Sequence, residues 1–395
     1  MSRVRLVSCA LMLCIVLPAS SKAPAQSNTF GNATAASPAA PVPLLPQEGY
    51  NDKNGWSWPG TEWKQVSPEA EGFSAERLEA LRSFLKTHQT DAMMVVSRGH
   101  VIFEYGDVKL VSKTASVRKS VLSLLYAVEM QKGVKFDLDK SVVELGLEDK
   151  TPFIEPEQLA TLQQLMMSRS GIYIRSGNDE DDKISPKRGA GYPGVRWFYN
   201  NWDFDAAGLA FEKIAHKDIF DALRDDLAIP LRFQDFDRSR QKKNYIENST
   251  HFEYATYLST RDMARIGLLA ISHGMWGNTL WGDPGFIEFS VYPTTSFAAR
   301  NELKAEGWTG RWGYGMLWWA WEAPMFPGNT WTGPYQGAFS AMGSGGQYIT
   351  AFPAYNLLVV HKVNIDEDPR RNVSEPTYMT ILDMVLDAKC DKKCQ

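Results

Sequence analysis

The chain has 395 residues, of which 44% are hydrophobic, 12% aromatic and 22% charged. This composition is typical of a globular enzyme and excludes a disordered tail protein, a collagen-like fibre and a small disulfide-stabilised protein. The formal net charge of −4 provides no basic surface for phosphates, so nucleic acid is not an expected partner. A chain of this length can bury a large core and is expected to divide into two lobes.

The first 25 residues have the pattern of a secretory signal peptide. Arg3 and Arg5 precede an apolar run at 6–17, and Ala23-Pro24-Ala25 supplies small residues at the spacing that a signal peptidase reads. The run is short for a membrane span, so we expect cleavage, export to a periplasm or the medium, and no stable membrane span afterwards. An uncleaved anchor is the alternative. Cleavage would change the formal charge from −4 to −7.

Two cysteines remain in the mature chain, Cys390 and Cys394, and both lie in a C-terminal tail at 389–395. In an oxidising compartment they could close a small loop, which would stabilise little beyond the tail. Two cysteines at this spacing without a nearby histidine are not typical of a metal site, and the six histidines show no metal-ligand spacing. The sequence therefore predicts neither a metal nor a cofactor.

The predicted elements begin after an extended lead-in at 26–66, which lacks helical or strand periodicity. The folded domain is predicted at 67–388. Its expected elements are a helix after Ser74, a hairpin from 92–96 and 101–105, an apolar helix at 114–128, a mostly helical region at about 134–260, strands at 347–352 and 356–363, and a closing helix at 375–386. This order predicts an α/β (α+β) fold in which both chain ends build one sheet and a helical lobe is inserted between them. The site is expected in the cleft between the lobes.

The pattern Ser-x-x-Lys occurs three times, at Ser83, Ser116 and Ser239. Ser83 and Ser239 lie on a predicted solvent face and in a charged run, so both are interpreted as surface residues. Ser116 opens an apolar helix, and Lys119 lies on the same face one turn later. A partly buried lysine there could accept the serine proton without a histidine. The alternative interpretation of Ser116 is an ordinary helix N-cap.

A second motif, Tyr199-Asn200-Asn201, is the only Tyr-x-Asn in the chain. The phenol of Tyr199 could relay a proton with Lys119, and the amide of Asn201 could hold the lysine or a substrate carbonyl. The alternative is a buried aromatic residue with a capping asparagine. Ser176-Gly177-Asn178 is a rival for this second element.

The third motif is a glycine-rich turn, Gly343-Ser344-Gly345-Gly346, before a predicted strand. Glycine lets the backbone approach a ligand closely, and a free N–H here could pair with that of Ser116 as an oxyanion hole. Taken alone, such a run is usually a turn.

In this order and with a helical segment between the first and third, the three motifs resemble the serine β-lactamase and penicillin-binding protein family, in particular its class C-like branch of esterases, D-amino-acid peptidases and 6-aminohexanoate-dimer hydrolases. The resemblance covers about 67–388. It implies a β-lactamase-like antiparallel sheet flanked by helices, with Ser116 acylated, Lys119 and Tyr199 sharing acid–base work, and Asn201, Ser344 and Gly345 contacting substrate or oxyanion.

The chain departs from that family where β-lactamases and penicillin-binding proteins carry Lys-Thr-Gly, because it has Ala341-Met342-Gly343. The cation and hydroxyl that would pair with a substrate carboxylate are missing. The expected substrate is therefore a small ester or amide. The alternative is that the chain hydrolyses β-lactams or D-amino-acid peptides. A catalytically silent binding relative is a second alternative. The six tryptophans between Trp308 and Trp331 are expected mostly in the core, with one or two lining an apolar pocket.

Overall fold

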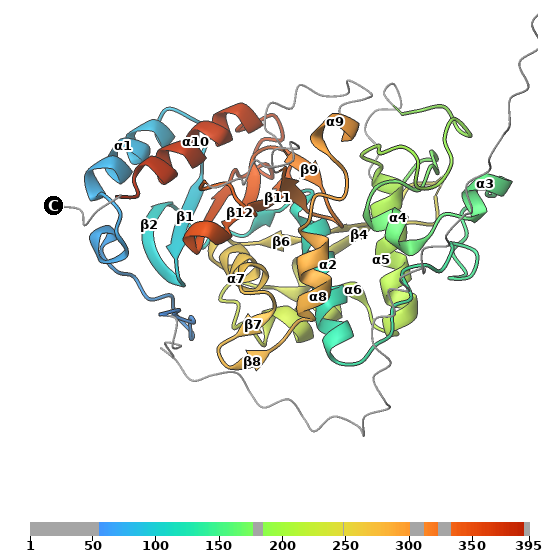
Figure 1. Cartoon of the computed structure of the whole chain (residues 1–395), viewed down its shortest axis with the longest axis horizontal. Coiled ribbons are helices and arrows are strands. Elements are labelled where there is room, and N and C mark those ends of the chain that lie inside the picture. The colour runs from blue at the N-terminus through green and yellow to red at the C-terminus, as the bar shows by residue number, and fades with distance from the viewer. Residues whose placement is uncertain (1–54, 177–184, 248, 301–311, 323–332, 391–395) are drawn as a thin grey trace, which may run out of the picture. The chain divides into compact units, whose positions relative to one another are not determined.

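A seven-stranded antiparallel sheet forms the centre of the computed structural model (Figure 1). The structure describes residues 55–390 except 177–184, 248, 301–311 and 323–332, and all of them belong to one unit of the chain, Pro43–Gln395. In spatial order the strands are β2 (His100–Gly106), β1 (Ala92–Ser97), β13 (Leu357–Lys362), β12 (Gln347–Phe352), β11 (Phe339–Gly343), β10 (Trp319–Trp321) and β9 (Trp312–Tyr314).

Both ends of the chain build this sheet, as the sequence predicts. The hairpin of β1 and β2 pairs with β13 in a register that places Ala92 opposite Lys362. All six residues of β1, β12 and β13 are buried, because helices cover the sheet on both faces. The central strands are therefore mostly apolar, and their buried polar residues are Ser97 of β1, Gln347 and Thr350 of β12, and His361 and Lys362 of β13.

Two helices from opposite chain ends, α1 (Ala75–Leu85) and α10 (Glu375–Asp387), pack together on one face of the sheet (Figure 1). Each begins at a serine N-cap whose hydroxyl accepts a backbone N–H, Ser74 for α1 and Ser374 for α10. The opposite face is covered by α7 (Thr260–Ile271), which contacts β1, β12 and β13. The predicted helix after Ser74 and the closing helix are thus confirmed.

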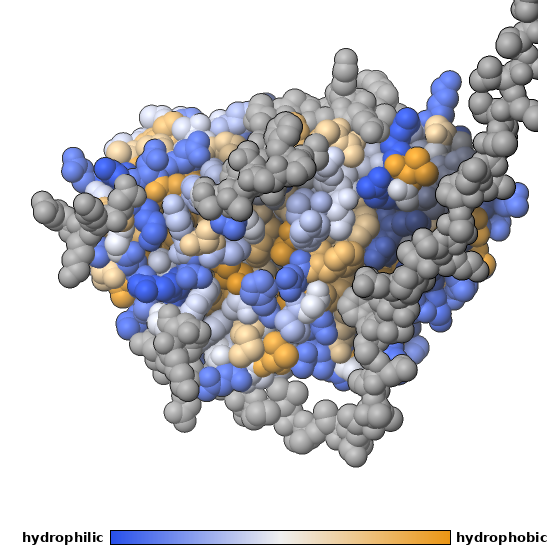
Figure 2. Space-filling view, in the orientation of Figure 1, coloured by the Kyte–Doolittle hydropathy of each residue, from blue (hydrophilic) through white to orange (hydrophobic). Residues whose placement is uncertain are grey.

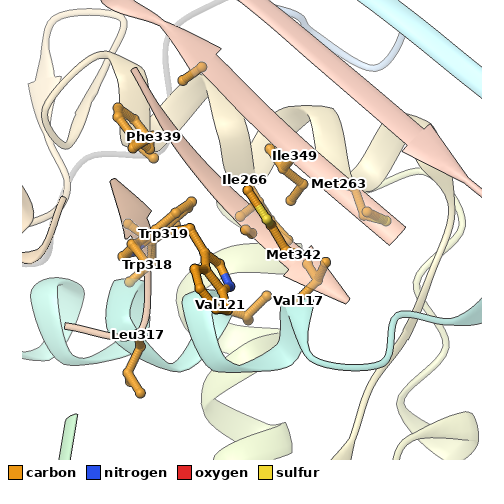
Figure 3. Packing of buried hydrophobic residues seen from close by; sticks show 14 of the residues in the cluster. Val117, Val121, Met263, Ile266, Leu317, Trp318, Trp319, Phe339, Met342 and Ile349 are labelled. Atoms are coloured by element: carbon orange, nitrogen blue, oxygen red, sulfur yellow. The ribbon is translucent and has the colours of Figure 1, made fainter. Parts of the chain in front are cut away.

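Helix α2 (Val117–Gln131) lies beside the sheet with thirteen of its fifteen residues buried. Figure 3 shows Val117 and Val121 packing toward Met342 of β11. The helix is buried on nearly all sides because it sits in the middle of the molecule, and most of its buried residues are apolar. This central position holds the residues at the N-terminus of α2 in a fixed place relative to the sheet.

The middle of the chain contains more strand than the sequence analysis expected. Its helices are α3 (Glu155–Gln158), α4 (Leu162–Met166), α5 (Asn201–Ala215), α6 (Ile219–Ala222) and a π-helical turn at Leu223–Ala228. Three short strands accompany them: β4 (Lys242–Asn244), β5 (Glu253–Ala255) and β6 (Tyr257–Leu258), the last paired with β3 (Ser112–Lys113). Strands of two or three residues are too short to show periodicity, which is why the pattern did not reveal them.

After α7 come the hairpin of β7 (Met275–Trp276) and β8 (Thr279–Leu280), α8 (Pro284–Ser290) and α9 (Phe297–Arg300). Short 3₁₀ turns occur elsewhere in the chain, at Pro68–Glu71, Arg238–Arg240 and Pro353–Tyr355. On the face shown in Figure 2, hydrophilic residues cover most of the surface and smaller hydrophobic areas lie near the middle. Among the helices in the described part of the chain, none combines the length and apolar character needed to cross a membrane.

The packed part of the chain begins earlier than the predicted start at residue 67. Trp58 is buried and lies 5.4 Å from the ring of Trp276, and Gln65 forms a bridge with Val101 of β2. Tryptophan side chains bury a large area, so they can anchor a segment that has no secondary structure of its own. At the other end, Cys390 is disulfide-bonded, and Cys394 lies outside the described residues.

Candidate active site

Ser116 lies directly before α2, but it does not act as a capping residue. Its backbone already has helical angles, and its hydroxyl makes no capping hydrogen bond. The hydroxyl instead accepts a hydrogen bond of 2.7 Å from the Nζ atom of Lys119. The preceding residue, Ala115, has a φ of 47°, a left-handed conformation that is rare for alanine. The N-cap interpretation of Ser116 is therefore wrong, and the backbone strain lies next to the hydroxyl.

Lys119 joins Ser116 of the first motif to Tyr199 and Asn201 of the second. Its Nζ atom donates to Ser116 Oγ at 2.7 Å, to Tyr199 Oη at 2.9 Å and to Asn201 Oδ1 at 3.0 Å. An ammonium group has three N–H donors, so this arrangement satisfies all of them. The lysine is 1% exposed. A trio that met by coincidence would not converge on one buried cation, so the first two motifs form one site.

The Tyr-x-Asn segment is held by a polar network behind it. Asn200, the N-cap of α5, donates through Nδ2 to Ile172 O at 2.6 Å and to Asp203 Oδ1 at 2.7 Å. Asp203 also accepts from the backbone N–H and the hydroxyl of Ser170. Burial raises the pKa of Asp203 well above its usual range. The network fixes the start of α5, and with it Tyr199 and Asn201 on either side of Asn200.

Of the rival second motif, Ser176-Gly177-Asn178, the structure describes the serine. Ser176 is buried and hydrogen-bonded to Asp205; burial raises the pKa of that carboxyl, and the hydrogen bond from Ser176 acts in the opposite direction. Gly177 and Asn178 lie outside the described residues. The other two Ser-x-x-Lys patterns are on the surface as predicted, since Ser83 and Ser239 are both exposed.

The third motif forms the turn between β11 and β12 and lies beside Ser116. A Cβ atom added to Gly343 would come within 3.0 Å of the Ser116 backbone nitrogen and 2.6 Å of the Thr114 carbonyl oxygen, so only glycine fits here. Ser344 is exposed and Gly345 is half-buried, with a φ of 78°. Within the described ranges, the backbone N–H groups of Ser116 and Ser344 have no protein acceptor. Two such donors on either side of one position could bind an oxyanion.

A cavity of about 410 Å³ opens beside these groups, which is a volume suited to a small ligand. Its walls come from the N-terminus of α2, the Tyr199 segment, the sheet and the start of α10. The lining residues are Ser116, Tyr199, Trp319, Met342, Gly343, Ser344, Gly345, Tyr348, Asn372, Ser374, Glu375 and Pro376. Asn201 is not among them, because its amide is turned toward Lys119.

One of the clustered tryptophans reaches the cavity. Trp319 lines it and stacks on Tyr199, with ring centroids 5.7 Å apart and planes at 18°. Trp312 and Trp318 are in the core, where Figure 3 shows Trp318 near Phe339. Trp321 is half-buried, and the two outermost members, Trp308 and Trp331, lie outside the described residues. The described members therefore match the expected division between core and pocket.

A buried ion pair that the sequence patterns did not predict joins the two helices that carry the site. Arg118, on α2, lies 3.0 Å from Asp205 of α5 and 4.0 Å from Glu253, with its guanidinium over the ring of Tyr254. Burial raises the pKa of Asp205 to about 7, although Arg118 and Lys119 act in the opposite direction. The available signal was a pair of charged residues inside otherwise apolar helical runs.

A second missed residue is His361 of β13, which is fully buried behind the glycine-rich turn. Its Nδ1 atom lies 2.7 Å from Gly346 O, and its Nε2 atom lies 2.9 Å from Thr90 Oγ1. Since a carbonyl oxygen can only accept, Nδ1 carries the proton and Nε2 accepts from the threonine. Burial lowers the pKa of His361 to about 4. The neutral imidazole thus ties the turn to the sheet.

Comparison with known protein families gives a match over most of the chain. The Beta-lactamase family model matches residues 81–383. This chain belongs to the Beta-lactamase family. No curated protein sequence matches it. Within this family of serine hydrolases and transferases, the chain has the fold of solved structures that share little sequence with it.

Three of these structures show the extent of the likeness. A Bacillus anthracis protein provisionally assigned as a 6-aminohexanoate-dimer hydrolase has 18% identity and a TM-score of 0.56, over 88% of this chain and 92% of that one. A β-lactamase from Mycobacterium bovis has 17% identity and a TM-score of 0.51, over 78% and 100%. EstCE1, a hydrolase with promiscuous acyltransferase activity, has 13% identity and a TM-score of 0.54, over 80% and 99%. At such identities the likeness establishes the fold alone.

Proposed function

We propose that this chain is a serine hydrolase that cleaves a small ester or amide through a covalent acyl-Ser116 intermediate. The observation that carries the proposal is the position of Lys119 Nζ, which is within 3.0 Å of Ser116 Oγ, Tyr199 Oη and Asn201 Oδ1 at once. A nucleophile in contact with a buried acid–base pair is the arrangement that covalent catalysis needs. Packing alone requires no such convergence.

The reaction begins when Ser116 Oγ attacks the carbonyl carbon of the substrate. The new C–O bond forms while the hydroxyl proton passes to the Lys119–Tyr199 pair, whose members share a hydrogen bond and one of which must be deprotonated to accept it. Negative charge develops on the substrate oxygen, where the N–H groups of Ser116 and Ser344 stabilise it. Asn201 keeps the lysine in place through its Oδ1 atom.

Collapse of the tetrahedral intermediate breaks the bond to the alcohol or amine, which takes the proton from the same pair. A water molecule then repeats the sequence on the acyl-Ser116 ester, giving its proton to the pair while the serine oxygen recovers one. The products are a carboxylic acid and free enzyme. No metal or cofactor takes part in these steps.

The test is active-site labelling with a fluorophosphonate, together with ester hydrolysis. We expect Ser116→Ala to abolish both, and intact mass to show an acyl adduct on the wild type. The matched control is Ser239→Ala, which removes an exposed serine from the same Ser-x-x-Lys pattern and should change nothing. Labelling that survives Ser116→Ala would refute the nucleophile, and no adduct from any ester, amide or β-lactam would favour a silent binding protein.

Hydrolysis of β-lactams is a second candidate, favoured by the family itself and by the likeness to the Mycobacterium bovis β-lactamase. The residues in place of Lys-Thr argue against it. Ala341 is fully buried and apolar, while Met342 puts a thioether in the cavity wall. We expect p-nitrophenyl esters to be cleaved faster than a chromogenic cephalosporin, and the reverse order would promote this candidate.

Export is part of the proposal. The mature enzyme would begin after Ala25 and act in a periplasm or outside the cell. Intact mass and N-terminal sequencing of the protein recovered from the exported fraction test this. A chain that retains residues 1–25, or that stays with the cytoplasmic fraction, would contradict it.

A further inference from the structure

A buried lysine of the central sheet reaches the strand that leads to the nucleophile. Lys362, the last residue of β13, is 2% exposed, and its Nζ atom donates to Ser112 O at 2.9 Å and to Leu258 O at 2.6 Å. These carbonyls belong to β3 and β6, which pair with each other in a separate two-stranded sheet. Lys362 therefore ties this small sheet to the seven-stranded one.

The small sheet is too short to hold its own position. Each of its strands has two residues, and a two-stranded ribbon is at best marginally stable without packing against other elements. The backbone N–H of Lys113 adds a hydrogen bond of 3.0 Å to Asp366, which follows β13 in the chain. The N–H of Thr114 bonds to Thr256 O at 2.9 Å. The place of β3 thus depends on bonds from β13 and from the segment after it.

The nucleophile follows β3 after Thr114 and Ala115. Ala115 has the left-handed φ of 47°, and a strained residue of this kind persists only where its surroundings fix the backbone on both sides. Helix α2 fixes the side of Ser116, and β3 fixes the other side. If β3 were released, Ala115 would relax toward ordinary backbone angles, and Ser116 Oγ would move away from Lys119.

The hydrogen bonds of Lys362 do not require it to be charged. Burial lowers the pKa of Lys362 to about 7, and the carboxylate of Asp366 acts in the opposite direction. A neutral amine retains two N–H groups, which matches the two carbonyl oxygens that it contacts. Lys362 therefore holds β3 on both sides of that pKa, and no part in proton transfer is needed.

We propose that Lys362 is a positioning residue for catalysis, which holds β3 against the central sheet and thereby keeps Ser116 Oγ within reach of Lys119. This inference rests on the proposed serine hydrolase function and adds to it a residue outside the cavity wall. A purely structural lysine would stabilise the fold without affecting the rate of the folded enzyme. Rate and stability are therefore measured separately.

The first variant is Lys362→Met, which keeps the apolar part of the side chain and removes the donors. We expect kcat for p-nitrophenyl butyrate to fall by about 10- to 100-fold, because a displacement of about 1 Å in a reacting group can cost that much. KM should change by less than about threefold, since no group in the cavity wall is removed. The rate at which a fluorophosphonate labels Ser116 should fall with kcat. Circular dichroism at the assay temperature establishes that the enzyme is folded.

The matched control is Arg265→Met. Arg265, on α7, is another fully buried cation that donates to backbone carbonyls, namely Leu231 O at 2.7 Å and Pro59 O at 3.4 Å. Neither acceptor is among the residues that line the cavity. We expect this variant to lose stability and to keep the wild-type kcat.

Lys362→Gln is a second test variant, and it supplies the same comparison if Lys362→Met does not fold. Its side chain is one bond shorter and keeps an N–H donor, so it cannot reach both carbonyls as the lysine does. We expect its kcat to lie between the values of Lys362→Met and the wild type.

Hydrogen exchange measures the hold on β3 without any substrate. We expect the amides of Lys113 and Thr114 to exchange about tenfold faster or more in the Lys362 variants than in the wild type. In Arg265→Met these two amides should keep the wild-type rate.

The outcomes separate this inference from the function beneath it. A folded Lys362 variant with wild-type kcat, or an equal loss of kcat in Arg265→Met, would overturn the positioning role and leave the hydrolase function intact. A wild-type chain that cleaves no ester and takes no label would overturn the proposed function. In that case hydrogen exchange still decides the hold on β3, because unchanged rates at Lys113 and Thr114 would overturn it.

Discussion

Arg118 of α2 and Asp205 of α5 form an ion pair of 3.0 Å in which neither side chain is more than 1% exposed. The pair joins the helix that begins at Ser116 to the helix that begins at Asn201, so it sets the distance between the nucleophile and the second motif. Glu253 and the Tyr254 ring complete the surroundings of the guanidinium.

Removing one partner of this pair should destabilise the protein strongly. In Arg118→Met the carboxylate of Asp205 remains buried near Glu253 without its partner, and we expect a loss of about 3–5 kcal/mol in the free energy of unfolding. Urea denaturation measures it. The double variant Arg118→Met/Asp205→Leu should recover part of the loss, because no buried charge is left unpaired at position 205. A loss below about 1 kcal/mol in the single variant would show that the pair does not hold the helices.

The acid–base pair should act as a unit in catalysis. We expect Lys119→Met to lower kcat/KM for p-nitrophenyl esters by about 10³-fold or more and Tyr199→Phe by about 10²–10⁴-fold. The double variant should be little worse than Lys119→Met, since both side chains serve one proton transfer. Lys242→Met, in the exposed Ser-x-x-Lys pattern, is the matched control. Losses that multiply in the double variant would mean that the two residues work independently.

Gly343 should tolerate no side chain. The Cβ atom of Gly343→Ala would meet the Thr114 carbonyl at 2.6 Å and the Ser116 nitrogen at 3.0 Å, so backbone must move. We expect a fall in kcat of about tenfold or more, together with a loss of about 1–3 kcal/mol in stability. Gly285→Ala in α8 is the control, because its Cβ would make only an ordinary contact at 3.5 Å. An unchanged kcat in Gly343→Ala would exclude this turn from the oxyanion site.

His361 predicts a loss of stability in acid. Its pKa is lowered to about 4 in the folded protein, whereas an unfolded histidine titrates near 6.5, so the unfolded chain takes up the proton first. The stabilisation is fully present above about pH 6.5 and is lost as the pH falls toward 4, by up to roughly 3 kcal/mol. Denaturation at several pH values should show a shallower acid slope in His361→Gln.

The exposed His273 provides the control for that experiment, because His273→Gln should keep the wild-type slope. His251, whose pKa is also lowered to about 4 by burial, leaves a residual slope in every variant. An identical slope in His361→Gln and the wild type would contradict the role of His361.

Elements with a full apolar pattern could be predicted from the sequence. The helix at Ala75–Leu85, the hairpin of β1 and β2, and strands β12 and β13 were expected within a few residues of their observed bounds. The three motifs also converge as expected, because spacing along a helix places Ser116 and Lys119 on one face.

The supporting contacts could not be predicted in this way. Asp203 is hydrogen-bonded to Ser170, and His361 is hydrogen-bonded to Thr90 and to the backbone carbonyl of Gly346. These partners are distant in the chain and meet only in the folded protein. A sequence pattern reports which side of an element faces the core, but it does not report which buried polar group meets which. The only signal was their polarity within apolar runs.

The place of β13 in the sheet has a consequence for the synthesis of the chain. This strand lies between β1 and β12, and it pairs Lys362 with Ala92, a residue made long before it. Until the ribosome has passed residue 362, β1 and β12 each have one edge without a neighbour, although Ser116 and Lys119 are already present. Fragments that end before Leu357 would therefore expose two strand edges with unpaired backbone groups. We expect such fragments to aggregate rather than retain partial activity.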